Sequence, residues 1–492
     1  MKPLLRSLAA SSALVAAAVP AAAQRAKTPE PALQEQLDDW FRTAVRRAPG
    51  EWGIAVADHQ GRLLWAVEPT KPMIPASTVK LLTTGYARSV LGADARRSTR
   101  VLGDGRVDAE TGAWLGTWAL EINGDPTLER AEDGPRLSDL AAQLRDRGIV
   151  QLTGPLTLVS AIGLAEAGWP DRWERRHRGR IFAPLIGNLT VNSNLITVSV
   201  APAAKIGARA VLVGAAPEGV GQLVTVTAKT VAGRRNRLRL IDRGGRYVIS
   251  GTIGNRAGTR SLARASSDPK ALLEAAWAAA LAKVGIEWVH SPAMSTAEHR
   301  APVVLAEVRS PIFDSVAAEI NRRSSNVGAE LLLRWAAAGD SAPAERLTAH
   351  VRQITGDYDG VSLVDGSGLS SENRVAPITF VSYMARFPLA PGGRNFPVLL
   401  PPNGAGTLSR LGSSLPERGV IRAKTGTLGN VASLVGYLGR QDGVLLVSVI
   451  YNGTRVWDAR QAEYDLFRRL GAEGVVIPGD SLESSLGSDP ER

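Results

Sequence analysis

The stretch "PASTVK" places a serine and a lysine where they could act as a nucleophile and its base. Ser77 and Lys80 are three residues apart at the start of an apolar run. Residues at this spacing share one face of a helix, so the two side chains would be within reach of each other. Serine needs a nearby base, and lysine is such a base near neutral pH only where burial or another cation lowers its pKa. The alternative is an ordinary helix start with an exposed lysine.

A second Ser-x-x-Lys stretch shows how little this spacing says alone. Ser267 and Lys270 lie in "SSDPKALLEAAW", where a serine or aspartate before Pro269 is typical of a helix start. We interpret this copy as structural. The first copy therefore needs a second cation near it before it indicates catalysis.

The stretch "RAKTGTLGN" contains such a cation. Lys424 supplies the charge, Thr425 a hydroxyl group, and Gly426 leaves room for an extended substrate to pair with the strand edge. The alternative is a β-turn with an exposed lysine.

A Ser-x-Asn pair in "RRSSNVGAELLLRWAAA" is the third candidate. Ser324 and Asn326 precede an apolar run with helical spacing, and the alternative is a helix N-cap cluster. A rival pair, Ser371 and Asn373, lies in a Gly/Ser-rich stretch with no helical pattern behind it. We therefore favour Ser324 and Asn326.

Other catalytic classes find little support. The chain has no cysteine, which excludes thiolate catalysis, and it has no phosphate-binding loop, zinc helix or G-x-S-x-G nucleophile motif. Its five histidines are dispersed, with no pair at the spacing of helical metal ligands.

The N-terminal residues have the pattern of a secretory signal. Lys2 and Arg6 are followed by an apolar run, and Ala21 and Ala23 give a small-x-small cleavage site. This predicts a signal peptide over residues 1–23, a periplasmic mature protein from Gln24, and no membrane span in that mature chain. The net charge of +11 would suggest nucleic-acid binding in a cytosolic protein, but export argues against such a partner. We therefore expect a solvated basic surface that is attracted to anionic envelope polymers.

Hydrophobic spacing divides the chain into an outer part, made of its two ends, and an inner part between them. The outer part shows a helix at 25–48, a hairpin at 52–69, a helix from Ser77, a second hairpin at 431–453 and a helix at 456–472. Residues 24–97 and 302–473 are thus predicted to form one α/β domain. The inner part has the short alternating segments of a β-rich insert, with one clear helix at 268–285. We predict one accessory domain from 98–198 and 259–301, a second from 199–258, and a flexible tail at 474–492.

Taken in order, "STVK", "SSN" and "KTG" resemble the three motifs of penicillin-binding proteins and serine β-lactamases. Ser324 lies 244 positions after Lys80, and this gap resembles the insert of the S13 peptidases, the class C penicillin-binding proteins. The stretches "NGDPTL", "GWP", "LTVNSNLITV", "DGSGLS" and "GAGTLSRL" agree, over roughly residues 30–470. The resemblance implies an α/β (α+β) serine β-lactamase/transpeptidase-like domain, split by a large β-rich insert of one or two accessory domains.

The resemblance also implies an activity: exported D-alanyl-D-alanine carboxypeptidase and endopeptidase cleavage of peptidoglycan. Ser77 would attack the carbonyl between the two D-alanines with Lys80 as its base. Ser324 would pass the proton to the leaving amine, and Asn326 would hold the substrate amide and contact Lys80.

The third motif is implied to bind the substrate. Lys424 and Thr425 would hold its terminal carboxylate, beside Gly426. The backbone N–H groups of Ser77 and Thr427 would form the oxyanion hole. The expected partners are peptidoglycan stem peptides and β-lactams as covalent inhibitors, with peripheral envelope association of the protein. The resemblance implies no metal and no organic cofactor.

One segment departs from the family pattern. Between "GWP" and "FAP" the chain reads "DRWERRHRGRI", where relatives use an acidic residue to read the amino group of the diamino acid. Asp171 and Glu174 are crowded by five arginines, so neither is assigned that role. Two other functions stay open at this point: a β-lactamase or esterase, and a non-catalytic envelope-binding protein on the same fold.

Overall fold

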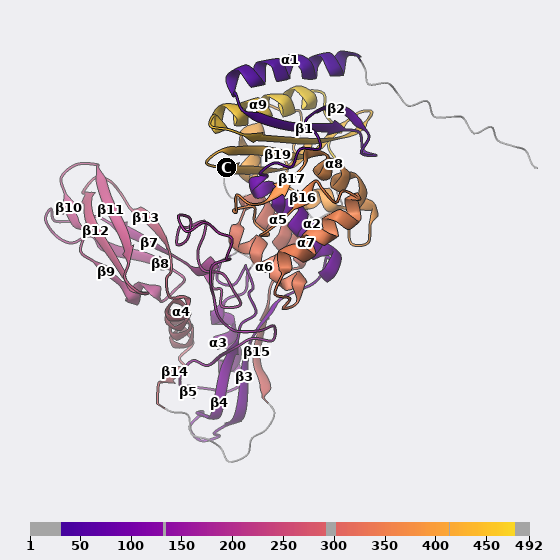
Figure 1. Cartoon of the computed structure of the whole chain (residues 1–492). Helices are drawn as coiled ribbons and strands as arrows, with labels where there is room; N and C mark the ends of the chain where they lie inside the picture. The colour runs from indigo at the N-terminus through magenta and orange to yellow at the C-terminus, as the bar shows by residue number, and fades with distance from the viewer. Residues whose placement is uncertain (1–30, 131–133, 292–301, 413, 478–492) are drawn as a thin grey trace, which may run out of the picture.

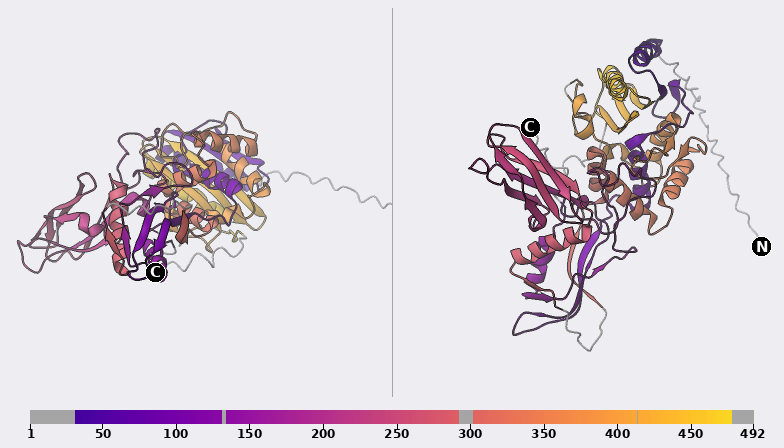
Figure 2. Two further views of the ribbon diagram at one scale, coloured as in Figure 1. Left: turned by 90° about the horizontal axis from the view of Figure 1, so that it is seen from below. Right: turned by 60° about the vertical axis from the view of Figure 1, so that its left-hand side comes forward.

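The computed structural model describes residues 31–130, 134–291, 302–412 and 414–477. The predicted signal peptide, the cleavage site before Gln24 and residues 478–492 of the predicted tail lie outside these ranges. In the described ranges, no helix has both the length and the apolar character that crossing a bilayer requires. Three lobes are visible: a catalytic body formed by both ends of the chain, an insert base below it, and a β-sandwich that extends to one side (Figures 1 and 2).

The catalytic body is built on a five-stranded antiparallel sheet in the order β18-β19-β20-β1-β2. Its strands come from both ends of the chain: β1 (Glu51–Ala57), β2 (Leu63–Val67), β18 (Ile421–Leu428), β19 (Val431–Arg440) and β20 (Gly443–Asn452). Strand β1 pairs with β20 over its whole length, from Glu51 opposite Asn452 to Ala57 opposite Leu446. Both predicted hairpins are present, and this pairing joins them into one sheet.

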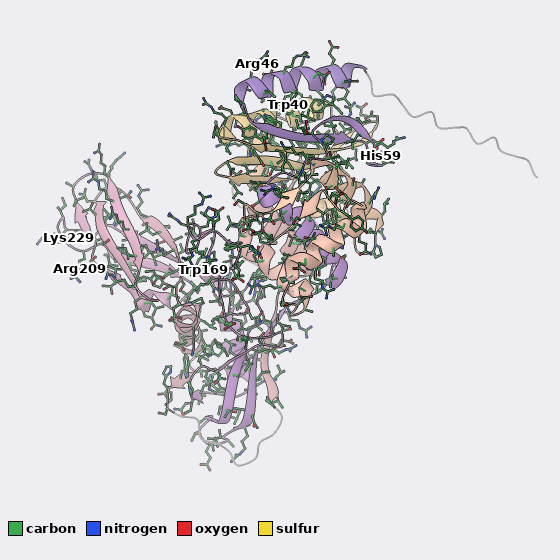
Figure 3. The ribbon with its side chains drawn as sticks, viewed as in Figure 1. Trp40, Arg46, His59, Trp169, Arg209 and Lys229 are labelled. Atoms are coloured by element: carbon green, nitrogen blue, oxygen red, sulfur yellow. The ribbon has the colours of Figure 1, made fainter. Side chains whose placement is uncertain are left out.

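Helices cover both faces of this sheet. One face packs against α1 (Pro31–Arg47) and α9 (Val456–Gly471), which bury Leu37 and Phe467 on it. Trp40 points from α1 toward the sheet and donates its indole N–H to the carbonyl oxygen of Ala462 at 2.9 Å (Figure 3). The other face carries the helices that hold the candidate site: α2 (Val79–Leu91), α5 (Phe313–Arg323), α6 (Asn326–Ala337), α7 (Pro343–Thr355) and α8 (Pro377–Arg386). Short strands β16 (Val361–Ser362) and β17 (Arg374–Val375) pair beside them.

The insert base is a second sheet, in the order β15-β3-β4-β6. Its elements, with the helices and the short strand pair that pack on it, are β3 (Ser98–Val107), β4 (Trp114–Glu121), α3 (Leu137–Asp146), β5 (Gln151–Thr153), β6 (Leu158–Val159), α4 (Pro269–Lys283), β14 (Glu287–Val289) and β15 (Val303–Arg309). The prediction of a single helix here was wrong, because α3 also forms. Helix α3 is only ten residues long, and a helix of this length is marginal on its own. It is stabilised by burying Leu140 and Leu144 against the insert core.

The sandwich, defined here as residues 195–265, contains two small sheets. One has the order β13-β7-β8, and the other has the order β10-β12-β11 with β9 also paired to β12. The strands are β7 (Leu195–Ala201), β8 (Val211–Ala216), β9 (Val224–Val226), β10 (Lys229–Val231), β11 (Asn236–Asp242), β12 (Tyr247–Gly254) and β13 (Arg260–Ala265). The predicted domain limits remain a proposal, and the pairing of β7 with β13 favours 195–265 over 199–258 for this unit.

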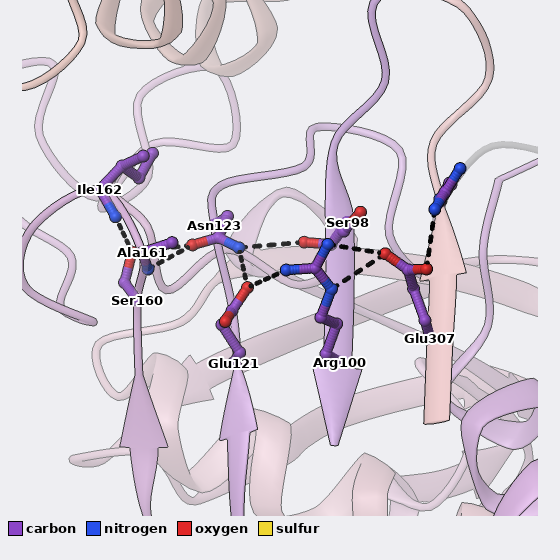
Figure 4. Close-up of polar contacts among 9 residues, drawn as sticks. Ser98, Arg100, Glu121, Asn123, Ser160, Ala161, Ile162 and Glu307 are labelled. Carbon is purple, nitrogen blue, oxygen red and sulfur yellow. Dashed lines mark hydrogen bonds and ion pairs between the residues drawn. The ribbon is translucent and has the colours of Figure 1, made fainter. Parts of the chain in front are cut away.

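A polar network joins the strands of the insert base where they approach the catalytic body (Figure 4). Arg100 on β3 bridges Glu121 on β4, at 3.4 Å, and Glu307 on β15, at 2.9 Å. Asn123 donates to Glu121 at 2.7 Å and accepts from the Ser160 hydroxyl and the Ala161 amide, at 3.0 and 2.9 Å. The "NGDPTL" stretch thus begins with a residue that fixes strand ends.

Replacement of Asn123 should loosen this junction. Asn123→Ala leaves the Ala161 amide without its acceptor, so we expect about 1–3 kcal/mol of lost stability, measured as a lower midpoint of denaturant unfolding. Ser160→Ala is the control, because the Ala161 amide keeps its partner and the loss should be smaller. Equal midpoints for the wild type and Asn123→Ala would contradict this role.

Candidate active site

The structure brings Ser77 and Lys80 together at the base of a polar cluster. Ser77 lies on a single 3-10 turn, Ala76–Thr78, and α2 begins at Val79 rather than at Ser77 as predicted. The Lys80 ammonium is 2.8 Å from the Ser77 hydroxyl oxygen. Ser77 is partly exposed, whereas the Lys80 side chain is fully buried. The arrangement joins an accessible hydroxyl group to a base that water does not reach.

Three oxygen atoms surround the Lys80 ammonium. Besides Ser77, it donates to the Asn326 side-chain oxygen at 2.7 Å and to the Ser367 carbonyl oxygen at 2.5 Å. Burial lowers the pKa of Lys80 to about 7, although the carboxyl groups of Asp365 and Glu330 act in the opposite direction. Lys80 can therefore exchange a proton near neutral pH, as a base for Ser77 must.

Asp365 and Glu330 form a buried acidic pair behind this lysine, which the sequence analysis missed. Glu330 accepts from the backbone amides of Gly366 and Ser367, at 3.0 and 2.9 Å, and its pKa is raised to about 7 by burial. Burial also raises the pKa of Asp365. For Glu330, the available sequence signal was its place inside the apolar run "VGAELLLRW". It lies four residues after Asn326 and hence on the same helical face.

Ser324 and Asn326 lie at the junction between α5 and α6. Ser324 ends α5 with a left-handed backbone, φ 56°, and Ser325 caps α6 by accepting from the Gly328 amide at 3.1 Å. The N-cap alternative is thus correct for Ser325, and the same junction turns Ser324 and Asn326 toward the two lysines. The rival Asn373 is instead fully buried and donates to Asp365 at 3.0 Å.

Strand β18 carries the third motif along the edge of the sheet. Lys424 is fully buried and donates to the Ser324 hydroxyl at 2.9 Å. Burial, then the charges of Lys80 and Arg460, hold the pKa of Lys424 well below its usual value. Thr425 is also buried, while the Thr427 side chain is exposed.

Gly426 is where β18 passes closest to the nucleophile. A Cβ atom at this position would lie 2.7 Å from the Pro75 carbonyl oxygen and 2.9 Å from the Ser77 nitrogen. Beneath the strand, the buried Arg460 donates to the Gly426 carbonyl oxygen and to the Thr427 hydroxyl oxygen, and it pairs with Glu463 at 2.5 Å. Arg460 is a second group that sequence reasoning missed, since α9 is distant in sequence from Ser77.

The insert also reaches this site. Asn326 donates its side-chain N–H to the Phe182 carbonyl oxygen at 2.9 Å. Trp173 and Ile186 of the same segment pack on Leu331 of α6, and Trp169 packs against this small core. Glu174 accepts from the Ser371 hydroxyl at 2.8 Å and pairs with Arg176. Residues 168–186, which include the arginine-rich stretch, thus pack beside Asn326 and α6.

The other candidates lie elsewhere. The second Ser-x-x-Lys pair is at the start of α4 in the insert, where Asp268 caps the helix by accepting from the Ala271 amide at 3.0 Å, as the structural interpretation predicts. Of the histidines, His350 contacts the Tyr383 hydroxyl at 3.0 Å within the aromatic core. Among the described residues, no three His, Asp or Glu side chains gather as metal ligands would.

Comparison with known proteins assigns this architecture to one group. The family described as D-Ala-D-Ala carboxypeptidase 3 (S13) matches residues 33–470. The chain is 28% identical to the D-alanyl-D-alanine carboxypeptidase of Actinomadura sp. (strain R39) over 443 residues, 86% of this chain and 81% of that protein. It is 28% identical to carboxypeptidase DacB of Mycolicibacterium smegmatis (strain ATCC 700084 / mc(2)155) over 415 residues, 80% of this chain and 74% of that one.

A solved structure shares the fold. The crystal structure of penicillin binding protein 4 from Haemophilus influenzae superimposes with a TM-score of 0.69 and 21% identity, covering 87% of this chain and 99% of that one. The β-rich insert is therefore part of the shared fold.

The close passage at Gly426 gives a test of the geometry. Gly426→Ala should force β18 away from the Ser77 turn and lower stability by about 1–3 kcal/mol, as overpacking does in other buried sites. Denaturant unfolding of the purified protein measures this loss. Gly429→Ala is the matched control, because a Cβ atom there meets nothing within 4 Å. Equal stability of the two variants would show that the strand is not held against the turn.

Proposed function

The chain belongs to the S13 family of D-Ala-D-Ala carboxypeptidases, and from that premise we propose that it is an exported peptidoglycan peptidase that works through an acyl-enzyme on Ser77. Membership makes it a hydrolase with a β-lactamase/transpeptidase-like domain split by a β-rich insert. The observation that supports the nucleophile best is the 2.8 Å contact between Ser77 and the fully buried Lys80.

The first step is acylation. Neutral Lys80 takes the Ser77 proton as the hydroxyl oxygen bonds to the carbonyl carbon between the two D-alanines. The backbone N–H groups of Ser77 and Thr427 stabilise the oxyanion. The C–N bond then breaks, and the leaving amine receives a proton through Ser324. The Ser324 hydroxyl accepts a hydrogen bond from Lys424 at 2.9 Å. Water hydrolyses the ester and regenerates Ser77.

The residues around Ser77 bind the substrate. Lys424 and Thr425 bind the carboxylate of the terminal D-alanine, and Asn326 holds the backbone amide of the preceding residue. The absence of a side chain at Gly426 lets β18 run close to the Ser77 turn, so a peptide that lies along the edge of β18 is held beside the nucleophile. When the leaving amine belongs to a neighbouring stem peptide, the same steps cut a cross-link, which is the endopeptidase reaction.

Inhibition by β-lactams follows from the same chemistry. The strained amide of a penicillin presents a carbonyl carbon and a carboxylate in the positions of the dipeptide, so Ser77 opens the ring and stays acylated. Penicillin binding protein 4 from Haemophilus influenzae, which shares the fold, has been crystallised with a β-lactam.

A fluorescent penicillin tests the nucleophile. The wild type should gain the mass of one intact penicillin, Ser77→Ala should gain none, and Ser267→Ala, which alters the structural Ser-x-x-Lys copy, should label like the wild type. Release of D-alanine from a soluble peptide ending in D-Ala-D-Ala should follow the same order. Rapid loss of the adduct with penicillin turnover would favour the β-lactamase alternative. A folded wild type with neither adduct nor D-alanine release would favour the non-catalytic binding protein.

The pKa of Lys80 predicts the pH dependence of acylation. The neutral amine is the active form, so the rate rises with pH through about 7 and is roughly tenfold lower at pH 6 than at pH 8. Stopped-flow acylation with the same penicillin measures this profile.

Removal of one buried acid should shift that profile. Glu330→Gln keeps an oxygen acceptor for the Gly366 and Ser367 amides but loses the charge that raises the pKa of Lys80, so the inflection should move to lower pH. The exposed Glu345→Gln is the control and should leave it unchanged. A flat profile, or a shift to higher pH in Glu330→Gln, would rule out Lys80 as the titrating base.

A further inference from the structure

The net positive charge of the chain is concentrated in the sandwich. Residues 195–265 contain 12 of the 58 Lys and Arg residues but only 2 of the 47 Asp and Glu residues. This unit therefore carries a net charge of +10, out of +11 for the whole chain. The remaining 46 basic and 45 acidic residues almost balance. The basic character is a property of one lobe, not of the protein surface in general.

All twelve cationic side chains are exposed. Within the described ranges, none of them takes part in an ion pair or a side-chain hydrogen bond. They are Lys205, Arg209, Lys229, Arg234, Arg235, Arg237, Arg239, Arg243, Arg246, Arg256, Arg260 and Arg264. Elsewhere in the molecule several exposed arginines pair with acidic side chains, as Arg62 does with Asp58 and Arg346 with Asp340, whereas the sandwich itself contains only two acidic residues, Glu218 and Asp242.

The strands present these charges in fixed directions. On β11, Arg237 and Arg239 point outward, because they alternate with Leu238 and Leu240, which face the sandwich core. Arg209 and Lys229 lie opposite each other in a β-bridge and mark the outer end of the lobe (Figure 3). Like charges placed opposite each other on neighbouring strands are destabilising. An anionic partner would remove that cost.

The composition of the lobe indicates which kind of anion it suits. Its one aromatic residue, Tyr247, is only 1% exposed. Binding at a membrane interface usually relies on exposed Trp or Phe side chains, and binding of single-stranded nucleic acid relies on stacking. The lobe exposes no aromatic side chain, and its exposed large apolar residues are the smaller Ile206, Val211, Val213 and Ile241. Charges spread over strand faces, edges and loops suit a flexible polyanion better than a flat bilayer.

The substrate itself is such a polymer. A stem peptide that ends in D-Ala-D-Ala carries a free carboxylate, removal of the last residue leaves a new one, and cutting a cross-link adds another. The polymer is therefore anionic before and after the reaction. The sandwich and the catalytic body form separate arms above the insert base (Figure 2), so one stretch of polymer can be held while another enters the site.

We propose that the basic face of the sandwich is a docking surface for the carboxylate-bearing peptidoglycan on which the catalytic body acts. The inference rests on the proposed function for the identity of the polymer. It adds a second contact, distant from Ser77, that raises the local concentration of stem peptides without taking part in the chemistry.

Co-sedimentation with insoluble purified peptidoglycan tests this surface. The full mature chain should bind at low salt and be released as the salt concentration rises. Replacing Arg234, Arg235, Arg237 and Arg239 together by Gln should weaken binding about tenfold or more, since each exposed charge pair contributes modestly. Replacing the same four by Lys should preserve binding, which separates loss of charge from damage to the fold. The matched control replaces four exposed arginines outside the sandwich by Gln, namely Arg46, Arg145, Arg394 and Arg418, and should bind like the wild type.

Further measurements separate the polymer, the site and the alternatives. Blocking the peptidoglycan carboxylates as amides should abolish binding, and Ser77→Ala should bind normally, so failure of the proposed catalysis would not be confused with failure of docking. The sandwich variant should still release D-alanine from a soluble peptide at the wild-type rate. Equal binding of the sandwich and control variants, or binding to anionic phospholipid vesicles but not to peptidoglycan, would overturn the proposal.

Discussion

The burial of the Lys80 ammonium is the constraint on which the rest of the site depends. A lysine without water needs oxygen acceptors, and Lys80 takes one from its own turn, one from α6 and one from the loop after β16. Three segments far apart in sequence must therefore meet at one nitrogen atom. The charge of Lys80 also lowers the pKa of the second buried lysine, Lys424. Burial lowers the pKa of Lys80 to about 7 against the opposing effect of Asp365 and Glu330, so the two acids limit how far burial lowers it.

The insert contributes to this environment as well as to the size of the protein. Phe182, directly after the arginine-rich stretch 171–181, accepts a hydrogen bond from the Asn326 side chain through its carbonyl oxygen, and Trp173 within that stretch is buried against α6. Asn326 is thus held from two sides, by Lys80 and by the insert. The stretch that departs from the family pattern therefore lies beside Asn326, so differences in substrate choice are expected to arise there.

Side-chain chemistry and order along the chain were enough to find the motif residues. Ser77, Lys80, Ser324, Asn326 and Lys424 are recognisable because each motif combines reactive types at a short, fixed spacing. Glu330, Asp365 and Arg460 were missed because their importance comes from burial and from partners outside their own short stretches of sequence, such as the Gly366 amide for Glu330 and the Gly426 carbonyl oxygen for Arg460. The outer helices and hairpins follow hydrophobic periodicity, whereas helix α3 depends on tertiary packing that a ten-residue amphipathic pattern does not reveal.

The pairing of β1 with β20 has a consequence for how the protein forms. Glu51 lies opposite Asn452 in the register of β1 and β20, so the central sheet closes only after nearly the whole chain is available. Contacts of such long sequence separation are slow to form, while the insert, with its own core, can fold earlier. The insert precedes β18, β19 and β20 along the chain, so it can fold before these strands are available. Lys424 and Gly426 of β18 would therefore reach the Ser77 turn last, and the site would be incomplete until the C-terminal hairpin had docked.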